Sequence, residues 1–279
     1  MGNPWFQFKK FRVSQEKSAL RVGTDGVLLG AWCGINGAKR ILDVGTGTGV
    51  IALMLAQRTE ILINNFEVYG GEGQIHVSTA EINPHSDSVI AHMNEPSADD
   101  IAARIEAVEI CVEACEDATF NFRESPWNDR LNLHCEDFRK LPVSGKTSFD
   151  LIISNPPFFK NSLRSADHSS SVARHDVTLT FEQLVLGAKE LLTPQGRLAV
   201  IVPAESFSDF RETARLAGFY LSRKTLLIPK TGKPPKRVLL EFSVVPCYPV
   251  EEELVILLND QQYSAEFISL TREFYLNFE

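Results

Sequence analysis

The second half of the chain alternates between short apolar runs and stretches with apolar residues at helical spacing. Phe149 to Ser154 and Arg197 to Val202 are nearly continuous apolar runs, which predicts two buried strands. Between them, Phe181 to Leu192 repeats apolar residues every three or four positions, which predicts a helix, and Gly196 lies just past its end. A further helix is predicted at Ser208 to Ala217. This alternation indicates an α/β domain with a mostly parallel sheet and helices on both faces.

The remaining C-terminal residues predict a different end to the sheet. Leu221 to Ile228 and Val238 to Val245 are strand-like and joined by residues 229–237, which are rich in Pro, Gly and Lys. We therefore expect one antiparallel strand at the sheet edge. Leu254 to Leu258 can add a strand, and Ala265 to Phe278 predicts a closing helix.

The N-terminal region predicts a small cap and then the first strand-turn-helix unit. Residues 6–13 alternate between apolar and polar, as is typical of a short strand or hairpin arm. Thr24 or Asp25 is expected to cap the helix formed by the apolar residues that follow. Arg40 to Val44 then predicts a buried strand, and Val50 to Arg58 a helix after a glycine turn.

Residues 61–104 do not continue this alternation. They contain Gly70-Gly71 and long polar runs at the place where a second strand should follow the first helix. We interpret them as a surface insertion. The chain is then a single domain over residues 1–279, with residues 1–36 as an N-terminal strand and helix cap.

Composition narrows the class of protein. No run of about 20 apolar residues appears, so no membrane span is expected. The N-terminus lacks the basic and apolar segments of a signal peptide. The five cysteines lack metal-site spacing, so we expect reduced thiols, no metal and a cytoplasmic protein.

The net charge does not decide whether the protein binds nucleic acid. A net charge of -8 argues mildly against nucleic acid, but binding needs only a local basic patch. Basic residues do gather in two places, although such clusters are more often solvated surface. They are Lys9, Lys10 and Arg12 near the N-terminus, and Lys230, Lys233, Lys236 and Arg237 further on.

A glycine-rich turn follows the Arg40 to Val44 strand. Gly45, Thr46, Gly47 and Gly49 form a G-x-G-x-G pattern, whereas dinucleotide enzymes favour G-x-G-x-x-G. Asp43 precedes the turn and suits a cationic partner such as the methionine amine of S-adenosylmethionine, reached through a water molecule. On its own the motif is also compatible with an ordinary tight turn.

A second strand should end in an acid that accepts hydrogen bonds from the ribose hydroxyls of the cofactor. Glu81 and Glu109 are the candidates, and we favour Glu109 because an amphipathic helix and another strand, residues 131–135, follow it. After that strand, Glu136 or Asp137 can accept from the adenine amine of the cofactor. We choose Asp137, with Phe138 flanking the ring.

Asn155-Pro156-Pro157-Phe158 lies where a strand ends, the edge at which open α/β sheets bind ligands. The Asn155 side-chain oxygen and the Pro156 carbonyl can accept both protons of a planar amine, which the adjoining Pro157 helps to orient. Phe158 can stack on the flat ring of the substrate. Catalysis would then consist of alignment and electrostatic support. The simpler alternative is a rigid turn with a core phenylalanine.

With these motifs, the chain resembles class I S-adenosylmethionine-dependent methyltransferases with an N-P-P-[FYW] signature. More narrowly, it resembles the bacterial tRNA1(Val) (adenine(37)-N6)-methyltransferase family, over nearly the whole chain except residues 61–104. The glycine loop and the NPPF motif are shared by many relatives, and the N-terminal block is the specific part. The matching segments are Phe6 to Phe11, Arg21 to Trp32, Ile41 to Gly49, Ser125 to Trp127, Asn155 to Phe159 and Phe274 to Leu276.

The resemblance implies a Rossmann-like domain with a mostly parallel seven-stranded sheet and an antiparallel edge strand. It implies methylation of N6 of an adenine beside the anticodon of a tRNA, with S-adenosylmethionine as cofactor. It also implies that Gly23, Thr24 and Asp25 help to close the cofactor site, while Asn155 contacts both cofactor and substrate. The target base must leave its stack, and the serine-rich loop at residues 160–176 can close over it.

Three other functions remain open. Asn155 to Phe158, which we call the amine clamp, also suit a glutamine amide in a protein. A protein substrate would, however, predict an additional N-terminal helical domain. Methylation of DNA adenine at N6 or of ribosomal RNA guanine at N2 is also compatible with the motifs. A cofactor-binding protein without activity is the third. For the oligomeric state, a monomer is favoured.

Overall fold

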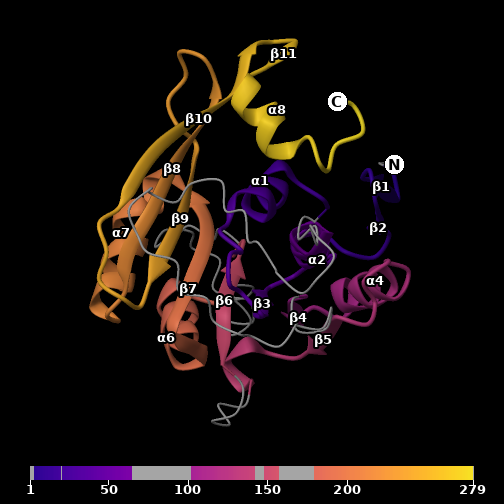
Figure 1. Ribbon diagram of the computed structural model, residues 1–279, viewed down its shortest axis with the longest axis horizontal. Helices are drawn as coiled ribbons and strands as arrows, with labels where there is room; N and C mark the ends of the chain where they lie inside the picture. Colours follow the sequence, from indigo (N-terminus) through magenta and orange to yellow (C-terminus); the bar gives the residue numbers. More distant parts are fainter. Residues whose placement is uncertain (1–2, 20, 65–101, 142–147, 157–178, 279) are drawn as a thin grey trace, which may run out of the picture.

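The computed structural model describes the chain except residues 1–2, 20, 65–101, 142–147, 157–178 and 279. Its centre is a nine-stranded sheet in the order β11-β10-β8-β9-β7-β6-β3-β4-β5 (Figure 1). The strands of this sheet are β3 (Arg40–Val44), β4 (Arg104–Glu109), β5 (Leu131–Cys135), β6 (Phe149–Ser154), β7 (Leu192–Pro203), β8 (Tyr220–Lys230), β9 (Arg237–Ser243), β10 (Val250–Asn259) and β11 (Gln262–Tyr263).

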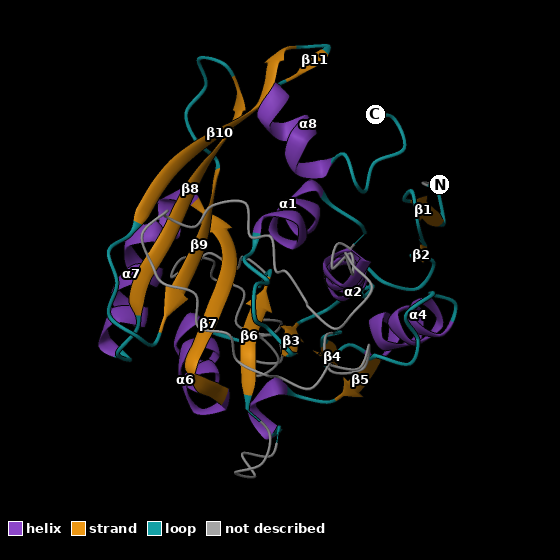
Figure 2. Cartoon of the chain, viewed as in Figure 1, coloured by secondary structure: helices purple, strands orange, loops and turns teal. Residues whose placement is uncertain are grey.

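The helices cover both faces of the sheet (Figure 2). They are α1 (Thr24–Trp32), α2 (Val50–Asn64), α4 (Val112–Arg123), α6 (Phe181–Leu191), α7 (Phe207–Leu216) and α8 (Ala265–Thr271), with short 3-10 turns η1 (Phe138–Lys140) and η2 (Ala204–Ser206). Alternate residues of a strand enter different cores: on β3, Ile41 packs on the side of α1 and α2, and Leu42 on the side of α6 and α7. The prediction of an α/β fold with helices on both faces is confirmed.

The prediction for the far side of the sheet is partly wrong. The antiparallel strand β9 lies between β7 and β8 rather than at the edge, and pairs with both. Beyond β8 lies the parallel strand β10, and then the short antiparallel β11. Within the described residues the sheet therefore has nine strands rather than the predicted seven. β9 is interior because its residues from Val238 to Phe242 are buried on both faces.

The boundaries of other elements also differ from the prediction. Helix α2 continues past Arg58 to Asn64, and β4 begins at Arg104. Residues 61–64 and Arg104, which the prediction placed in the insertion, therefore belong to α2 and β4, and residues 65–101 of it are outside the described residues. The closing helix is shorter than predicted, because α8 ends at Thr271 and the chain turns there with a hydrogen bond from Phe274 N to the Thr271 carbonyl (2.9 Å).

The two ends of the chain meet on the face of the sheet that carries α1 and α2. Strands β1 (Trp5–Gln7) and β2 (Arg12–Ser14) form the predicted hairpin. Lys9 N in its turn donates to the carbonyl of Phe274 (2.8 Å), and the rings of Phe8 and Tyr275 stack with centroids 6.2 Å apart. Phe6 to Phe11 and Phe274 to Leu276, the first and last segments that resemble the family, thus pack against each other.

Candidate active site at the carboxyl ends of the strands

The three predicted motifs converge on one edge of the sheet. Val44, at the end of β3, pairs in parallel with Val108 of β4 on one side and with Ser154 of β6 on the other. The glycine loop after β3, Glu109 after Val108 and Asn155 after Ser154 therefore leave the sheet side by side. This edge, where the strands end, is where open α/β sheets bind ligands.

The loop needs glycine at three positions, for two different reasons. Gly45, Gly47 and Gly49 have φ angles of 70°, 58° and 83°, the left-handed region that other residues seldom adopt. A Cβ on Gly49 would also lie 2.5 Å from the ring of Phe122, so this glycine lets α4 pack against the loop. A Cβ on Gly45 or Gly47 would meet no described atom within 4 Å, which leaves open space beside the loop.

Asp43 is completely buried beneath this loop. Its Oδ2 accepts a hydrogen bond from the Thr46 hydroxyl (2.6 Å), but its Oδ1 has no hydrogen-bond partner among the described residues. Burial raises the pKa of Asp43 to about 7, against the opposite effects of the Thr46 hydroxyl and the Ala52 amide. An unsatisfied buried carboxylate oxygen is costly, and a cationic ligand nearby would relieve that cost.

Glu109 is the last residue of β4, as predicted for the end of the second strand, and it lies beside the glycine loop. Its Oε2 accepts from Gly47 N (2.9 Å), and its Oε1 accepts from the amides of Ile110 and Cys111 (2.9 Å each). The predicted amphipathic helix follows as α4. Glu81 is outside the described residues, so the assignment of the ribose contact to Glu109 stays a prediction.

Asp137 and Phe138 follow the end of β5 but face different surroundings. Asp137 caps η1 by accepting from Arg139 N (2.9 Å) and pairs with the Arg139 guanidinium (2.5 Å). This hydrogen-bonded guanidinium lowers the pKa of Asp137. Phe138 is only 7% exposed, and a Cβ on Gly187 of α6 would lie 2.6 Å from its ring. Phe138 thus serves the core, and its contact with an adenine ring stays a prediction.

The described part of the amine clamp is Asn155 and Pro156, half-buried and buried respectively. The strand before them is held by Ser154 Oγ, which donates to the Val44 carbonyl (2.8 Å). A Cβ on Gly26 of α1 would lie 3.9 Å from Asn155 Nδ2, so the first turn of α1 borders the clamp. Pro157, Phe158 and the loop after them lie outside the described residues.

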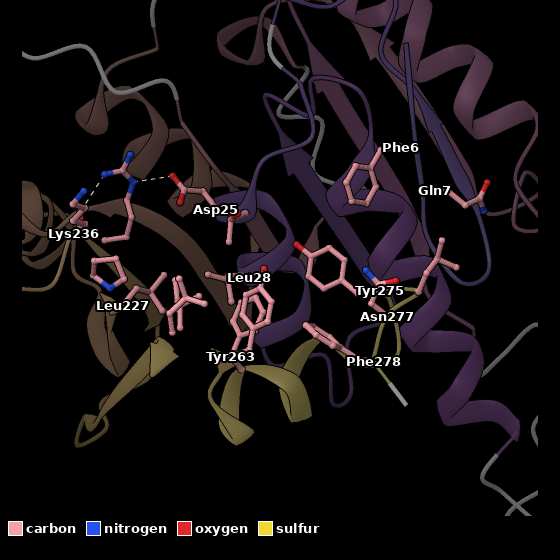
Figure 3. A pocket seen from close by; sticks show the side chains of 17 residues that line it. Phe6, Gln7, Asp25, Leu28, Leu227, Lys236, Tyr263, Tyr275, Asn277 and Phe278 are labelled. Carbon is pink, nitrogen blue, oxygen red and sulfur yellow. Dashed lines mark hydrogen bonds and ion pairs between the residues drawn. The ribbon is translucent and has the colours of Figure 1, made fainter. Parts of the chain in front are cut away.

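The start of α1 differs from its prediction. Gly23 is the N-cap, and no side chain caps the helix; Thr24 and Asp25 lie in its first turn. The carboxylate of Asp25 instead pairs with Nε of Arg237 (2.7 Å), as drawn in Figure 3. Asp25 thereby joins the N-terminal cap to β9. A role for Gly23, Thr24 and Asp25 in closing the cofactor site stays a prediction.

Two buried polar residues of α4 were missed in the sequence. Asn121 donates through Nδ2 to the carbonyls of Thr48 and Ser14 (2.9 Å each), which ties the glycine loop to the N-terminal hairpin. Asp117 accepts from the amides of Lys17 and Ser18 (3.0 and 2.8 Å). Their i, i+4 spacing beside the apolar face of α4 was the available signal.

Other site types find no support in the described part of the chain. No group of three or more His, Cys, Asp or Glu side chains there is placed to hold a metal ion. No helix there has the length and apolar character needed to cross a membrane.

Comparison with known proteins agrees with this geometry. A protein of Bacteroides fragilis named tRNA1(Val) (adenine(37)-N6)-methyltransferase is 38% identical over 99% of this chain and 99% of its own length. A relative of the same name from Phocaeicola vulgatus is 39% identical over 99% of this chain and 100% of its own length. The family model of the Eco57I restriction-modification methylase matches residues 72–227.

Solved structures give the same fold. That of a predicted O-methyltransferase from Agrobacterium tumefaciens aligns with a TM-score of 0.59 and 17% identity, covering 90% of this chain and 96% of the other. A class I S-adenosylmethionine-dependent methyltransferase structure from Listeria monocytogenes aligns with a TM-score of 0.50 and 14% identity, covering 89% and 68%. Both show the fold alone, whereas the full-length relatives show that this chain belongs to the tRNA1(Val) (adenine(37)-N6)-methyltransferase family, with a central part that the Eco57I methylase model also describes.

Proposed function

We propose that this protein transfers a methyl group from S-adenosylmethionine to N6 of adenine 37 in tRNA1(Val). The observation that carries the proposal is the position of Asn155 at the end of β6, beside the glycine loop of β3, in a chain 38% identical to relatives of that name over their full length. An amine held at Asn155 would lie next to a cofactor held by the loop.

The residues at this edge fit the cofactor. S-adenosylmethionine, when bound, supplies a methyl group on a positively charged sulfur, and it also carries an amine. Asp43, with its unpartnered Oδ1, suits that positive charge. The open side of Gly45 and Gly47 allows close approach to the loop. We assign Glu109 to the ribose hydroxyls and Asp137 to the adenine amine.

Asn155 and Pro156 would do the work on the substrate. The adenine amine is a poor nucleophile because its lone pair is delocalised into the ring. The Asn155 side-chain oxygen and the Pro156 carbonyl would accept hydrogen bonds from its two N–H groups, which favours a tetrahedral nitrogen with its lone pair toward the methyl group. Pro157 and Phe158 complete the proposed clamp, with Phe158 stacked on the base.

A second candidate is methylation of DNA adenine. The match to the Eco57I restriction-modification methylase model over residues 72–227 favours it, because this stretch contains the clamp. In either nucleic acid the base must leave its stack to reach Asn155. The full-length relatives favour tRNA over this candidate.

The test offers labelled S-adenosylmethionine and total tRNA from a strain lacking the gene, with DNA, ribosomal RNA and protein extract in parallel. We expect label in one tRNA, and mass spectrometry should place it on N6 of adenine 37. Asn155→Ala should abolish turnover and leave cofactor affinity largely intact. Label found only in DNA or in protein would contradict the tRNA proposal, and the latter would support a glutamine substrate.

We also propose that the protein works as a monomer in the cytoplasm, where tRNA is modified. Light scattering on the purified protein, with and without tRNA, measures the oligomeric state. A stable dimer in the absence of RNA would contradict the first part, and fractionation of cells tests the second.

A further inference from the structure

A cleft of about 770 Å³ lies beside the first turn of α1 (Figure 3). Its walls come from parts of the chain that are far apart in sequence: the N-terminal hairpin, α1, the β8–β9 turn, β10 and the C-terminal tail. β8 and β10 run parallel, and both reach the cleft at their carboxyl ends, through Pro229 and Leu257. The cleft therefore opens at the same sheet edge as the glycine loop.

One wall of the cleft is aromatic. Tyr263 stacks on Phe267 with centroids 4.9 Å apart and an interplanar angle of 13°, yet it remains 42% exposed. The Phe278 ring meets Tyr263 edge-on at 5.3 Å and Tyr275 at 5.7 Å. Tyr275 reaches Phe6 of the hairpin at 6.2 Å. Such a connected set of partly open rings is suited to stacking with flat heterocycles.

Two basic residues, Lys236 and Arg237, line the cleft away from its aromatic wall. They end a basic stretch from Lys230 to Arg237 that contains no acid, of which Lys230 and Lys233 lie outside the cleft lining. Lys230 pairs with Asp260 (2.6 Å), and Arg237 pairs with Asp25. Lys233 and Lys236 are exposed and make no ion pair among the described residues. In a protein with a net charge of -8, an exposed lysine in the same cleft as these aromatic rings, with a second in the same turn, indicates an anionic, base-bearing ligand.

The cleft and Asn155 border different faces of the first turn of α1. Thr24 and Asp25 line the cleft, whereas Gly26, about 200° around the helix from Thr24, borders Asn155. A strand of nucleotides that places one base at Asn155 would therefore bring its neighbours over the first turn of α1.

We propose that this cleft binds unpaired RNA nucleotides next to the target base, with a base stacked on Tyr263, one phosphate held by Lys236 in the cleft and a neighbouring phosphate held by Lys233, which lies outside the lining in the same turn. The inference rests on the proposed function and adds the place where the RNA is held outside the catalytic site. An apolar peptide would fill the aromatic wall but would leave the two lysines uncompensated, so RNA fits the cleft better.

The test measures binding of tRNA1(Val) transcript by fluorescence anisotropy at several salt concentrations, separately from methylation. Tyr263→Ala should weaken RNA binding and raise KM for tRNA about tenfold through the loss of one base-aromatic contact. The kcat should change by less than about twofold. Lys233→Ala and Lys236→Ala should each lower the slope of log Kd against log salt by about 0.7.

Matched controls separate this effect from misfolding or general charge. Tyr263→Phe keeps the ring and should restore most of the affinity. Tyr248→Ala removes a 94% exposed aromatic in the β9–β10 loop, and Lys39→Ala an exposed lysine before β3, both at the opposite sheet edge. Both should bind RNA as the wild type does, and S-adenosylmethionine affinity should be unchanged in every variant.

The outcomes distinguish the two proposals. If the wild type methylates the tRNA but Tyr263→Ala binds it equally well, the cleft inference is wrong and the proposed function stands. Equal losses in Tyr248→Ala and Tyr263→Ala would also overturn it. If the wild type does not methylate tRNA, the proposed function itself fails. A loss confined to the cleft variants, with cofactor binding preserved, supports the inference.

Discussion

Asp43 and Asp137 occupy two neighbouring places on the same sheet edge, on either side of β4, but their environments are opposite. Asp43 is fully buried, has one oxygen with no partner among the described residues, and has its pKa raised to about 7 by that burial. Asp137 is bound on both oxygens by the Arg139 guanidinium, which lowers its pKa. Arg139 therefore satisfies both carboxylate oxygens of Asp137, whereas we expect a ligand to satisfy Oδ1 of Asp43.

This difference predicts that the ionisation of Asp43, and not that of Asp137, depends on whether the cofactor is bound. A positive charge near Asp43 would stabilise its ionised form in the folded protein, so binding and ionisation are coupled. Arg139 keeps the pKa of Asp137 below its usual value, so we expect any contribution of Asp137 to cofactor binding to be a hydrogen bond that does not depend on pH in the neutral range.

The largest effect is expected for Asp43→Asn. The variant removes the charge and retains an acceptor for the Thr46 hydroxyl, so the loop should keep its shape. We expect S-adenosylmethionine to bind about 100-fold more weakly, because a charged contact is lost. The variant without ligand should have a higher Tm at pH 8, because a buried charge is gone. Calorimetry measures both, and unchanged cofactor affinity would show that Asp43 is purely structural.

The next effect concerns Glu109. Glu109→Ala should weaken cofactor binding about 30-fold, because two ribose contacts and the support of Gly47 are lost together. Glu81→Ala is the matched control and should stay within about twofold of the wild type. Isothermal titration with S-adenosylmethionine decides between them, and the reverse ranking would transfer the ribose contact to Glu81.

A pH dependence follows from Asp43. Its unfolded pKa is near 3.8 and its folded pKa about 7, so the folded protein binds the extra proton and loses stability as pH rises between these values. A cationic ligand lowers the folded pKa, so binding releases that proton. Affinity for S-adenosylmethionine should therefore rise about tenfold from pH 6 to pH 8 and then level off. Asp43→Asn should abolish this rise, and a wild-type affinity that is flat over this range would contradict the coupling.

The positions of Asp43 and Glu109 at the ends of β3 and β4 could be predicted from sequence because each follows a local pattern, whereas their contacts with a cofactor stay predictions. The apolar run before Asp43 and the helix after Glu109 fix where strands end, and parallel register then brings the ends together. Asn121 and Asp117 were missed because their partners are about a hundred positions away in the sequence. The interior place of β9 was also missed, although its nearly continuous apolar run, broken only by Glu241, was a usable signal.

The cleft shows the limit of sequence reasoning more clearly. Phe6, Tyr263 and Tyr275 come from opposite ends of the chain and become one wall only through tertiary packing. The lysines of the β8–β9 turn were visible as a cluster, but nothing local distinguishes them from a solvated surface. The place of Lys236 in the same cleft as the aromatic wall, with Lys233 in the same turn, is what gives them a function in the proposed complex.

The smallest effect is expected for Asp137, and it completes the contrast with Asp43. Asp137→Asn should weaken cofactor binding about fivefold through one hydrogen bond. This loss should be constant from pH 6 to pH 8, because Arg139 keeps the pKa of Asp137 below its usual value. Arg139 makes four contacts with Asp137, two to each oxygen, and so already occupies the roughly four acceptor sites of the carboxylate. Replacing its guanidinium frees acceptor sites for the adenine amine. Arg139→Gln should therefore leave affinity within about twofold, and a loss equal to that of Asp137→Asn would mean that the pair only shapes η1.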